Sequence, residues 1–375
     1  MAKNLQTTTA NDRRKNTKNK VVPIETFVED EFVKNIFENV KPKNTLILGI
    51  SGGADSVYLL HRFLEIQKAR PELQLKLIIA HLNHGLRAKD SDTDEKFVKN
   101  LAKKNGIKFL NKKLNLKKSK SFFSKSKNSG NLEEAGREAR YDFFEQLRKR
   151  FKANWIVTAH HLNDNIETML FNLIRGAHLS GIKAMEVTLP SRHLLRPMLG
   201  LTKQEILDYL EQNHIEFRTD ATNDNTDFSR NWLRHKILPL FPKLNANFEQ
   251  TFKETLKNLA ETSKYLDEKS LEWLNKNTPI ELDKFLSEHH VFQKQLLVQL
   301  YKKIHGSTKK LTTKHLNEIL QVLNQRKSNT KKEFGPKTMI EVVWDIRQKP
   351  QKSAKTSASN RSNKKRRYIR LSTKK

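Results

Sequence analysis

Short apolar runs that end in small or polar residues recur along the first two thirds of the chain. Four of these runs predict buried strands, at residues 46–50, 75–80, 107–110 and 154–159. Between and around them lie segments whose apolar residues are three and four positions apart, the spacing of amphipathic helices. The clearest of these segments are residues 24–40, 57–70, 131–150 and 202–212. Strands that alternate with helices predict a parallel sheet with helices on its faces.

The pattern changes after about residue 245, where helical spacing over long stretches dominates. Helices are predicted at residues 248–274, 280–304 and 312–323, and alternation over residues 338–344 predicts a strand. No group of polar residues in this part suggests catalysis. Residues 347–375 hold twelve Lys and Arg residues and no acidic residue, which predicts a disordered basic tail.

The charge balance points to a polyanionic partner. The chain has 72 Lys and Arg residues against 41 Asp and Glu residues, a net charge of +31, and nucleic acid is the most plausible partner. The alternative is a genome-wide bias towards lysine codons, although that bias does not explain the clustering of the charges. The chain has no cysteine, which excludes disulfides, thiolate metal sites, Fe–S clusters and cysteine nucleophiles. No run of 18 apolar residues occurs, so no membrane partner is expected.

The first predicted strand runs directly into a glycine turn and the start of a helix. The turn reads Ser51-Gly52-Gly53-Ala54-Asp55-Ser56. Backbone N–H groups can converge on a phosphate at such a turn, and the glycines let it approach without meeting a Cβ. Asp55 could hold a Mg²⁺ ion that bridges phosphates. No Gly-Lys-Ser/Thr follows, so the turn is not a Walker A loop, and an ordinary strand–turn–helix is the alternative.

Polar residues also follow two other predicted strands, at the edge of a parallel sheet where ligands bind. His84 and Arg87 come after the second strand. His160, Asp164 and Glu167 come after the fourth, at positions i, i+4 and i+7, which would align them along one helix face. This spacing is not a zinc pattern such as His-Glu-x-x-His.

Two basic features could contact phosphates. Arg137 and Arg140 are three residues apart on one face of the predicted helix at 131–150, although Arg137 could instead pair with Glu133. Residues 103–127 contain ten lysines and no acidic residue. This stretch is read either as a loop that grips RNA phosphates or as a solvated insertion.

Seven motifs in this order resemble those of the tRNA(Ile)-lysidine synthetases, a family of PP-loop ATP pyrophosphatases. They are the turn at 51–56 (SGGxDS), residues 81–87 (HxNHxLR), the part of the helix at 131–150 that includes Arg140-Tyr141 (E…AR..RY), residues 160–168 (HHxDDQxET), residues 175–181, Arg196-Pro197, and residues 220–234 (DxxN and RNxxR). The match departs from the family at three positions. Asn163 stands where Asp is usual, Asn165 where Gln is usual, and His178 where Gly is usual.

The resemblance implies a Rossmann-like parallel sheet with a PP-loop, of the adenine nucleotide alpha hydrolase type, followed by a mainly helical C-terminal domain. The expected boundaries are a disordered basic arm at 1–22, the ATP-binding catalytic domain at 23–242, a helical linker and tRNA-binding domain at 243–345, and the basic tail at 346–375.

The resemblance also implies a reaction. L-Lysine would be ligated to C2 of the wobble cytidine of a tRNA(Ile) with a CAU anticodon, with ATP and Mg²⁺, through an adenylated tRNA. The cofactor-binding residues would be Ser51, Gly52, Gly53, Ala54, Asp55, Ser56, His84 and Arg87, with Asp55 as the metal ligand. Asp55, Asp164, Glu167, Arg140 and His160 would be catalytic, their division of labour left open.

Alternatives remain within and outside this family. The chain could be another PP-loop enzyme that modifies tRNA, or an RNA-binding relative without catalysis, although all three acidic residues of the site are present. The expected compartment is the bacterial cytoplasm or a plastid stroma, and a homodimer is left open.

Overall fold

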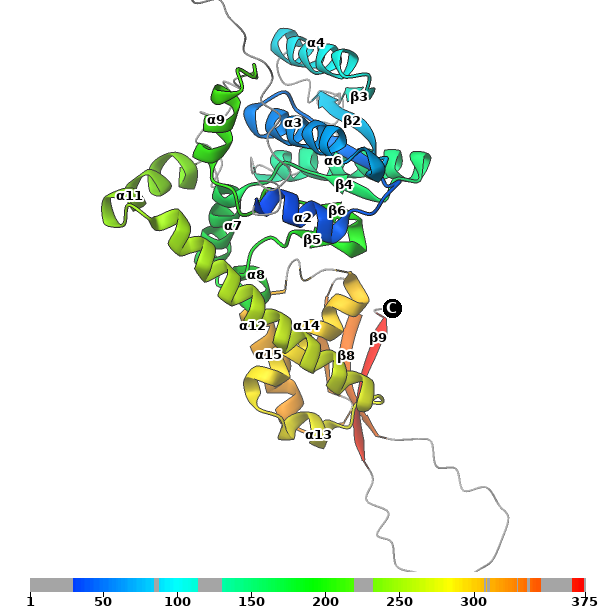
Figure 1. Ribbon diagram of the computed structural model, residues 1–375. Helices are drawn as coiled ribbons and strands as arrows, with labels where there is room; N and C mark the ends of the chain where they lie inside the picture. Colours follow the sequence, from blue (N-terminus) through cyan, green and yellow to red (C-terminus); the bar gives the residue numbers. More distant parts are fainter. Residues whose placement is uncertain are drawn as a thin grey trace, which may run out of the picture.

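A six-stranded sheet forms the centre of the N-terminal part of the chain in the computed structural model (Figure 1). The strands are β1 (Thr45–Gly49), β2 (Lys76–Asn83), β3 (Lys108–Lys113), β4 (Trp155–Val157), β5 (Thr188–Leu189) and β6 (Leu194–Leu195). Their order is β3-β2-β1-β4-β6-β5, with β5 antiparallel to β6 and the other pairs parallel. The structure describes residues 30–83, 88–113, 130–218, 232–306, 308, 311–328, 330–335, 338–344 and 366–373.

Helices cover both faces of this sheet (Figure 1). One face packs against α2 (Glu31–Asn39), α3 (Ala54–Ala69), α4 (Ala88–Lys104) and α9 (Lys203–Gln212). The other face packs against α6 (Gly130–Phe151). Gly49 allows α6 to approach closely, because a Cβ there would lie 2.8 Å from the ring of Phe144. Two short turns of helix, η1 (Pro71–Leu73) and η2 (Pro190–Arg192), precede β2 and β6.

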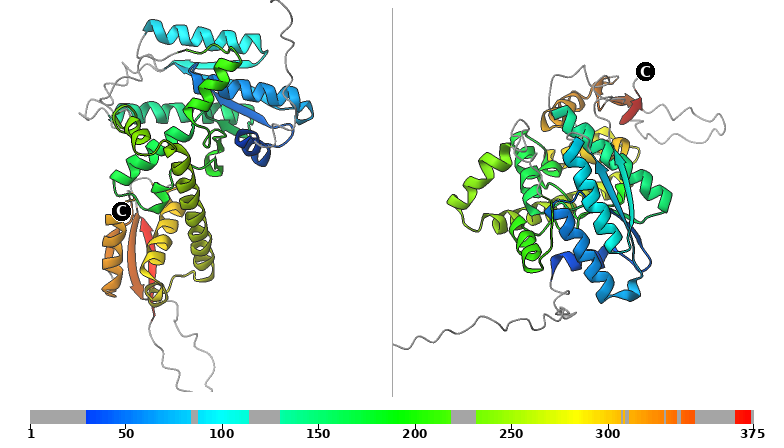
Figure 2. Two further views of the ribbon diagram at one scale, coloured as in Figure 1. Left: turned by 60° about the vertical axis from the view of Figure 1, so that its left-hand side comes forward. Right: turned by 90° about the horizontal axis from the view of Figure 1, so that it is seen from above.

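A group of helices leads from the sheet to the C-terminal part. These are α7 (Leu162–Ile174), α8 (Leu179–Ile182), η4 (Leu233–Ile237), η5 (Leu238–Leu240), α11 (Phe241–Leu244) and the long α12 (Phe248–Lys276). Apolar residues of α7, η5 and α12 share one core, which includes Leu162, Leu238 and Leu256. The helix α12 therefore packs with one end against α7 of the N-terminal part and with the other against α14 of the C-terminal part (Figure 2).

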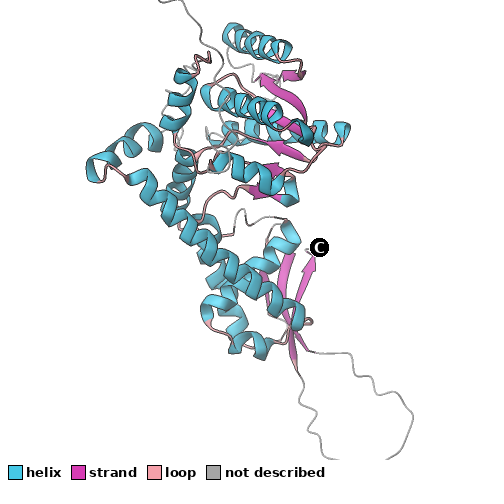
Figure 3. Cartoon of the chain, viewed as in Figure 1, coloured by secondary structure: helices cyan, strands magenta, loops and turns pink. Residues whose placement is uncertain are grey.

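The C-terminal part has its own apolar core, built from helices on one side of a small sheet (Figure 3). The helices are α13 (Leu282–Ser287), α14 (His290–His305) and α15 (Thr313–Asn324), and the antiparallel strands are β7 (Lys331–Glu333), β8 (Thr338–Trp344) and β9 (Arg367–Thr373). The predicted fold class is confirmed: a mostly parallel sheet with flanking helices, followed by a mainly helical region. None of the described helices is both long enough and apolar enough to cross a membrane.

Two predictions for the C-terminal part are wrong. The single helix expected at 280–304 is interrupted, because α13 ends at Ser287 and His289 caps the start of α14. The expected disordered tail at 346–375 contains β9, which pairs with β8 along seven positions. Ile369 is buried in the core and Leu371 packs against it, so a short apolar alternation stabilises a strand inside a strongly basic segment. The expected arm at 1–22 lies outside the described residues.

Candidate active site at the carboxyl edge of the sheet

The glycine turn after β1 presents three consecutive backbone N–H groups to two hydroxyl groups. The Ser51 and Gly52 amides donate to Ser56 Oγ, at 3.2 and 3.1 Å, and the Gly53 amide donates to Ser51 Oγ at 3.4 Å. Ser56 Oγ in turn donates to the Gly53 carbonyl at 2.9 Å. The amides thus converge on one small region at the N-terminus of α3, the arrangement that binds anions.

Only glycine suits the second position of this turn. Gly52 has a φ of +102°, and a Cβ there would lie 3.3 Å from Val98 Cγ2 of α4. The chain beyond α9 also returns to the turn, since the Arg218 amide donates to the Gly52 carbonyl at 2.9 Å. The Arg218 side chain pairs with Asp94 of α4. The turn is therefore supported from two neighbouring segments as well as from its own hydroxyl groups.

Asp55 connects the turn to the helices on either side. Its Oδ1 accepts a hydrogen bond from Lys203 Nζ, and its Oδ2 lies 3.8 Å from His161 Nε2. The carboxylate is about one third exposed, so a ligand can reach it. Among the described residues, no three His, Cys, Asp or Glu side chains form a group that could hold a metal ion. A metal ion at Asp55 would therefore need oxygen ligands from a bound phosphate, as is usual for Mg²⁺.

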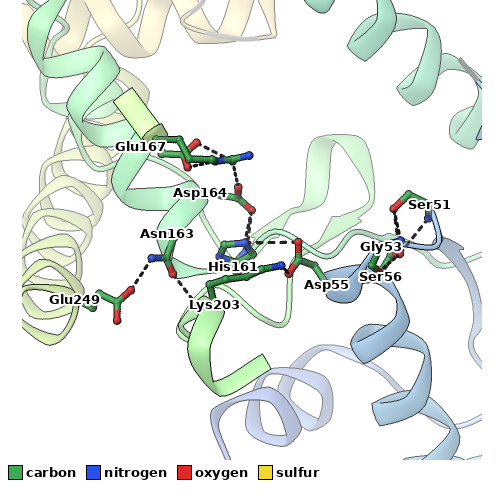
Figure 4. A network of polar contacts seen from close by, with 11 residues as sticks. Ser51, Gly53, Asp55, Ser56, His161, Asn163, Asp164, Glu167, Lys203 and Glu249 are labelled. Carbon is green, nitrogen blue, oxygen red and sulfur yellow. Dashed lines mark hydrogen bonds and ion pairs between the residues drawn. The ribbon is translucent and has the colours of Figure 1, made fainter. Parts of the chain in front are cut away.

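His161 lies between two carboxylates. It is the N-cap of α7, and its Nε2 is 3.5 Å from Asp164 Oδ2 in addition to its contact with Asp55. Its amide also donates to Asp164 Oδ2 at 3.2 Å. The ring is buried, and its Nδ1 has no hydrogen-bond partner among the described residues. Figure 4 shows His161 between Asp55 and Asp164, with the serine turn on one side and Glu167 on the other.

Arg234 of η4 holds both acidic residues of α7. Its Nε donates to Glu167 Oε1 at 2.6 Å, and its Nη2 donates to Glu167 Oε2 at 2.9 Å and to Asp164 Oδ1 at 3.0 Å. Burial favours protonated Asp164, but His161 and Arg234 hold its pKa below the usual range. Burial raises the pKa of Glu167, and the bonds from Arg234 limit that rise.

The predicted alignment of His160, Asp164 and Glu167 along one helix face is wrong for the histidine. The helix begins at Leu162, so His160 precedes it, and the His160 ring bonds Thr158 Oγ1 at 2.9 Å. The chain leaves β4 in extended form and turns helical only after His161, which shifts His160 away from the helical spacing. Asp164 and Glu167 do share one face, as their common partner Arg234 requires.

His160 is nevertheless coupled to the basic residues that α6 and β6 bring to this edge. Burial lowers the pKa of His160 to about 3, Asp164 opposes that change, and Arg196, Arg137 and Arg140 add to it. The predicted residue Arg140 is exposed, and it lies close enough to act on His160. The alternative pairing of Arg137 with Glu133 involves a side chain that the structure does not describe.

The two asparagines that depart from the family pattern have structural partners. Asn163 donates to Glu249 of α12 at 2.6 Å and accepts from the Lys203 amide at 2.9 Å. It therefore ties α7 to α9 and α12. Asn165 accepts from the Met185 amide at 2.7 Å and is buried.

The structure thus brings most of the predicted residues to one edge of the sheet. Two of them, His84 and Arg87, lie outside the described residues. Four residues of the site were not predicted to belong to it: His161, Arg234, Lys203 and Arg196. His161 adjoins the predicted His160, and Arg234 and Arg196 belong to motifs that had no assigned role. No sequence signal marks Lys203 beyond its place after the Thr202 cap of α9.

Known proteins resemble the chain over this region. A family model for the PP-loop domain matches residues 25–241. The tRNA(Ile)-lysidine synthase of Bacillus cereus is 34% identical over 267 residues, which cover 70% of this chain and 54% of that protein. The tRNA(Ile)-lysidine synthase of Chlorobaculum tepidum is 34% identical over 244 residues, which cover 64% of this chain and 69% of that protein. The chain thus spans about half the length of the Bacillus relative.

A solved structure shares the fold at much lower identity. The U34-tRNA thiolase NcsA from Methanococcus maripaludis is similar with a TM-score of 0.50 and 17% identity, over 64% of this chain and 81% of that one. This similarity concerns the arrangement of the sheet and its helices only.

Proposed function

The chain belongs to the tRNA(Ile)-lysidine synthase family of PP-loop proteins, and on that premise we propose that it joins lysine to a tRNA(Ile). The reaction is ATP-dependent ligation of L-lysine to C2 of the wobble cytidine in a CAU anticodon. The cytosine C2 oxygen is a poor leaving group, so ATP first adenylates it and releases pyrophosphate. The lysine ε-amino group then displaces AMP, and the codon that the tRNA reads changes from AUG to AUA.

The turn at 51–56 is the end of the site that handles phosphate. Its three converging amides and the start of α3 offer hydrogen bonds and a favourable dipole to a polyphosphate. The hydroxyl groups of Ser51 and Ser56, which now accept those amides, can rotate to donate to phosphate oxygens. These interactions stabilise the negative charge that grows on the leaving pyrophosphate.

Asp55 is the residue that would hold a Mg²⁺ ion at this site. It offers one accessible carboxylate beside the turn, the donor that Mg²⁺ takes from proteins when phosphate supplies the other oxygens. When bound, the ion would neutralise charge on the polyphosphate. Lys203, which pairs with Asp55, is placed to contact the same phosphates once the carboxylate has another partner.

Asp164 and Glu167 form the end of the site that receives lysine. The two carboxylates share one guanidinium, that of Arg234, so the three groups carry one net negative charge when both acids are ionised. That charge matches one ammonium group. Free lysine has a side-chain pKa near 10.4, so it arrives protonated and a carboxylate must accept its proton before attack. Asp164, whose pKa is low, holds the ammonium, and Glu167, whose pKa is raised, is the better proton acceptor.

One observation supports this assignment above the others: polar contacts from Asp55 through His161 to Asp164 join the phosphate turn to the acidic pair (Figure 4). Arg234 then pairs with Asp164. The test is incubation of the full chain with ATP, Mg²⁺, labelled lysine and a CAU-anticodon tRNA(Ile) transcript. Label should enter the tRNA, and Asp55→Ala and Asp164→Ala should abolish its entry. Absent incorporation, or incorporation that both variants leave unchanged, would contradict the proposal.

The tRNA itself is held in this proposal by the basic surface of the chain. The net charge of +31 favours contact with the phosphate backbone, and affinity should therefore fall steeply with salt. We place the reaction where tRNA(Ile) and ATP occur together, in the cytoplasm of a bacterium or in a plastid stroma. A homodimer stays a prediction.

A further inference from the structure

Three arginines gather around His160 on the side of the site formed by α6 and β6. The strands β4 and β6 are parallel, Val157 is in register with Leu195, and the Thr158 amide donates to the Leu195 carbonyl at 3.0 Å. Arg196 therefore leaves the sheet at the same edge as His160. Arg137 and Arg140 reach this edge from the first half of α6, where they share one face.

Arg196 is buried, and one of its N–H groups has no hydrogen-bond acceptor among the described residues. The residue is 6% exposed, its Nη1 donates to the Glu186 carbonyl at 2.9 Å, and it shares a hydrogen bond with Tyr141. Its Nε is buried and has no hydrogen-bond partner among the described residues. A buried N–H group without an acceptor costs free energy, so this donor is expected to meet one in the complete complex.

Among the described residues, Arg196 has one neighbour of like charge and one of opposite charge: Arg137, and Glu186, whose carboxylate is also paired with Lys183. The Arg137 guanidinium lies 5.4 Å from the centre of the Tyr141 ring and acts electrostatically on Arg196 as a like charge. His160 adds no charge of its own, because its low pKa keeps it neutral at physiological pH. Asp164, one of the two acidic residues at the lysine end of the site, also acts electrostatically on His160. The cluster is thus suited to a bound anion.

We propose that Arg196, together with Arg137 and Arg140, binds the α-carboxylate of the free lysine substrate. The inference rests on the proposed function. Free lysine carries an ε-ammonium at one end and an α-carboxylate beside an α-ammonium at the other, and His160 lies within electrostatic reach of both Asp164 and the three arginines. The ATP phosphates have a separate proposed site at the Ser51–Ser56 turn, beyond Asp55 and His161 as seen from Asp164 (Figure 4).

The test compares ligands that differ only at this end. Binding of L-lysine, L-lysinamide and cadaverine to the full chain is measured by calorimetry, with and without a non-hydrolysable ATP analogue. Lysinamide lacks the carboxylate charge, and cadaverine lacks the carboxyl group altogether while it keeps both amino groups. Lysine should bind on the order of 10- to 100-fold more tightly than lysinamide, as a charge-assisted pair with arginine implies.

Variants assign that preference to the arginines. Arg196→Gln and Arg137→Gln should each weaken lysine binding about tenfold and leave lysinamide and cadaverine unchanged, so the preference shrinks. Arg150→Gln is the matched control, since it changes an exposed arginine of the same helix about 20 Å along its axis. If Arg196→Gln does not fold, the ligand series on the unaltered chain and Arg137→Gln still decide.

Each outcome points one way. Equal affinity for lysine and lysinamide, no detectable lysine binding, or equal weakening of both ligands by Arg137→Gln overturns the inference. Weaker ATP binding with lysine binding unchanged also overturns it and assigns the cluster to phosphate. Lysine incorporation into tRNA is measured in parallel. Incorporation without the preference refutes this inference alone, and the preference without incorporation refutes the proposed function alone.

Discussion

The two ends of the site are held together in opposite ways. At the phosphate end, the backbone amides of the turn at 51–56 bond to neutral hydroxyl groups within the same six residues. At the lysine end, Asp164 and Glu167 are held by Arg234, which lies 70 and 67 residues further along the chain. The first end is thus encoded locally and the second by the fold. Changes at each end should therefore have separable effects.

Asp164→Asn should have the largest effect and should test that separation. The variant removes the charge that holds the lysine ammonium, so lysine incorporation should fall on the order of 10²- to 10⁴-fold. ATP affinity, measured by equilibrium binding, should stay within about twofold, since the turn makes no bond to Asp164. Asp142→Asn, at an exposed position of α6, is the control. A parallel loss of ATP affinity would break the comparison.

Arg234→Gln should change the pH profile of the lysine end. Arg234 favours the ionised forms of Asp164 and Glu167, so without it both should keep their protons to higher pH. The acidic limb of kcat/KM for lysine should move upward by about one pH unit or more, and activity on that limb should drop about tenfold. In the unaltered chain, the midpoint of the acidic limb should lie above pH 4.5, the ordinary pKa of glutamate, because burial raises the pKa of Glu167.

Arg148→Gln provides the matched control for this experiment. Arg148 donates two hydrogen bonds to Glu145 on α6, in the same forked manner as Arg234 to Glu167, but away from the site. Its profile should match that of the unaltered chain. If Arg234→Gln does not change the pH at which the acidic limb falls, the ionisation of Asp164 or Glu167 does not cause that limb.

Gly52→Ala should act on the phosphate end alone. The φ of +102° and the close contact with Val98 should cost about 1–3 kcal/mol of unfolding free energy. Because the strained turn misplaces its amides, ATP should bind several-fold more weakly, whereas lysine binding should not change. Gly106→Ala has a φ of +64° with open space around it, so it should lower stability and leave ATP affinity intact. Equal loss of ATP affinity in both variants would argue against the turn as the phosphate site.

Asn163→Asp should give the smallest effect. It tests whether the bonds of Asn163 to α9 and α12 keep the phosphate end and the lysine end of the site correctly placed. An aspartate can still accept from the Lys203 amide, but it repels Glu249 instead of donating to it. Stability should fall by about 1 kcal/mol and activity by a few-fold. Adding Glu249→Gln restores a donor opposite the new carboxylate and should recover most of both losses in a double-mutant cycle. A double variant no better than the single one would exclude this link.

The sequence predicts most fully what is local. The turn at 51–56 depends on bonds between residues at most five apart, and it forms as expected. Lys203 and Asp55 are 148 residues apart in the sequence, and no sequence pattern predicts that they pair. Whether His160 or His161 lies between Asp55 and Asp164 depends on the residue at which α7 begins after β4. A sequence pattern alone places such a boundary only to within a few residues.

The strand β9 illustrates a different limit. Its two apolar contributors, Ile369 and Leu371, alternate within a segment whose charge predicts disorder. Pairing with β8 and burial of Ile369 against the C-terminal core outweigh the charge repulsion. Composition describes the segment in isolation, whereas the strand depends on a partner that lies more than twenty residues earlier in the chain.

The most direct test of a site with two separable ends is a single turnover without lysine. The enzyme, in excess over CAU-anticodon tRNA(Ile), is mixed with ATP and Mg²⁺, and pyrophosphate release is followed for the unaltered chain, Asp55→Asn and Asp164→Asn. The account predicts a full burst of pyrophosphate from the unaltered chain and from Asp164→Asn, and none from Asp55→Asn. Loss of the burst in Asp164→Asn to the same extent as in Asp55→Asn would contradict it.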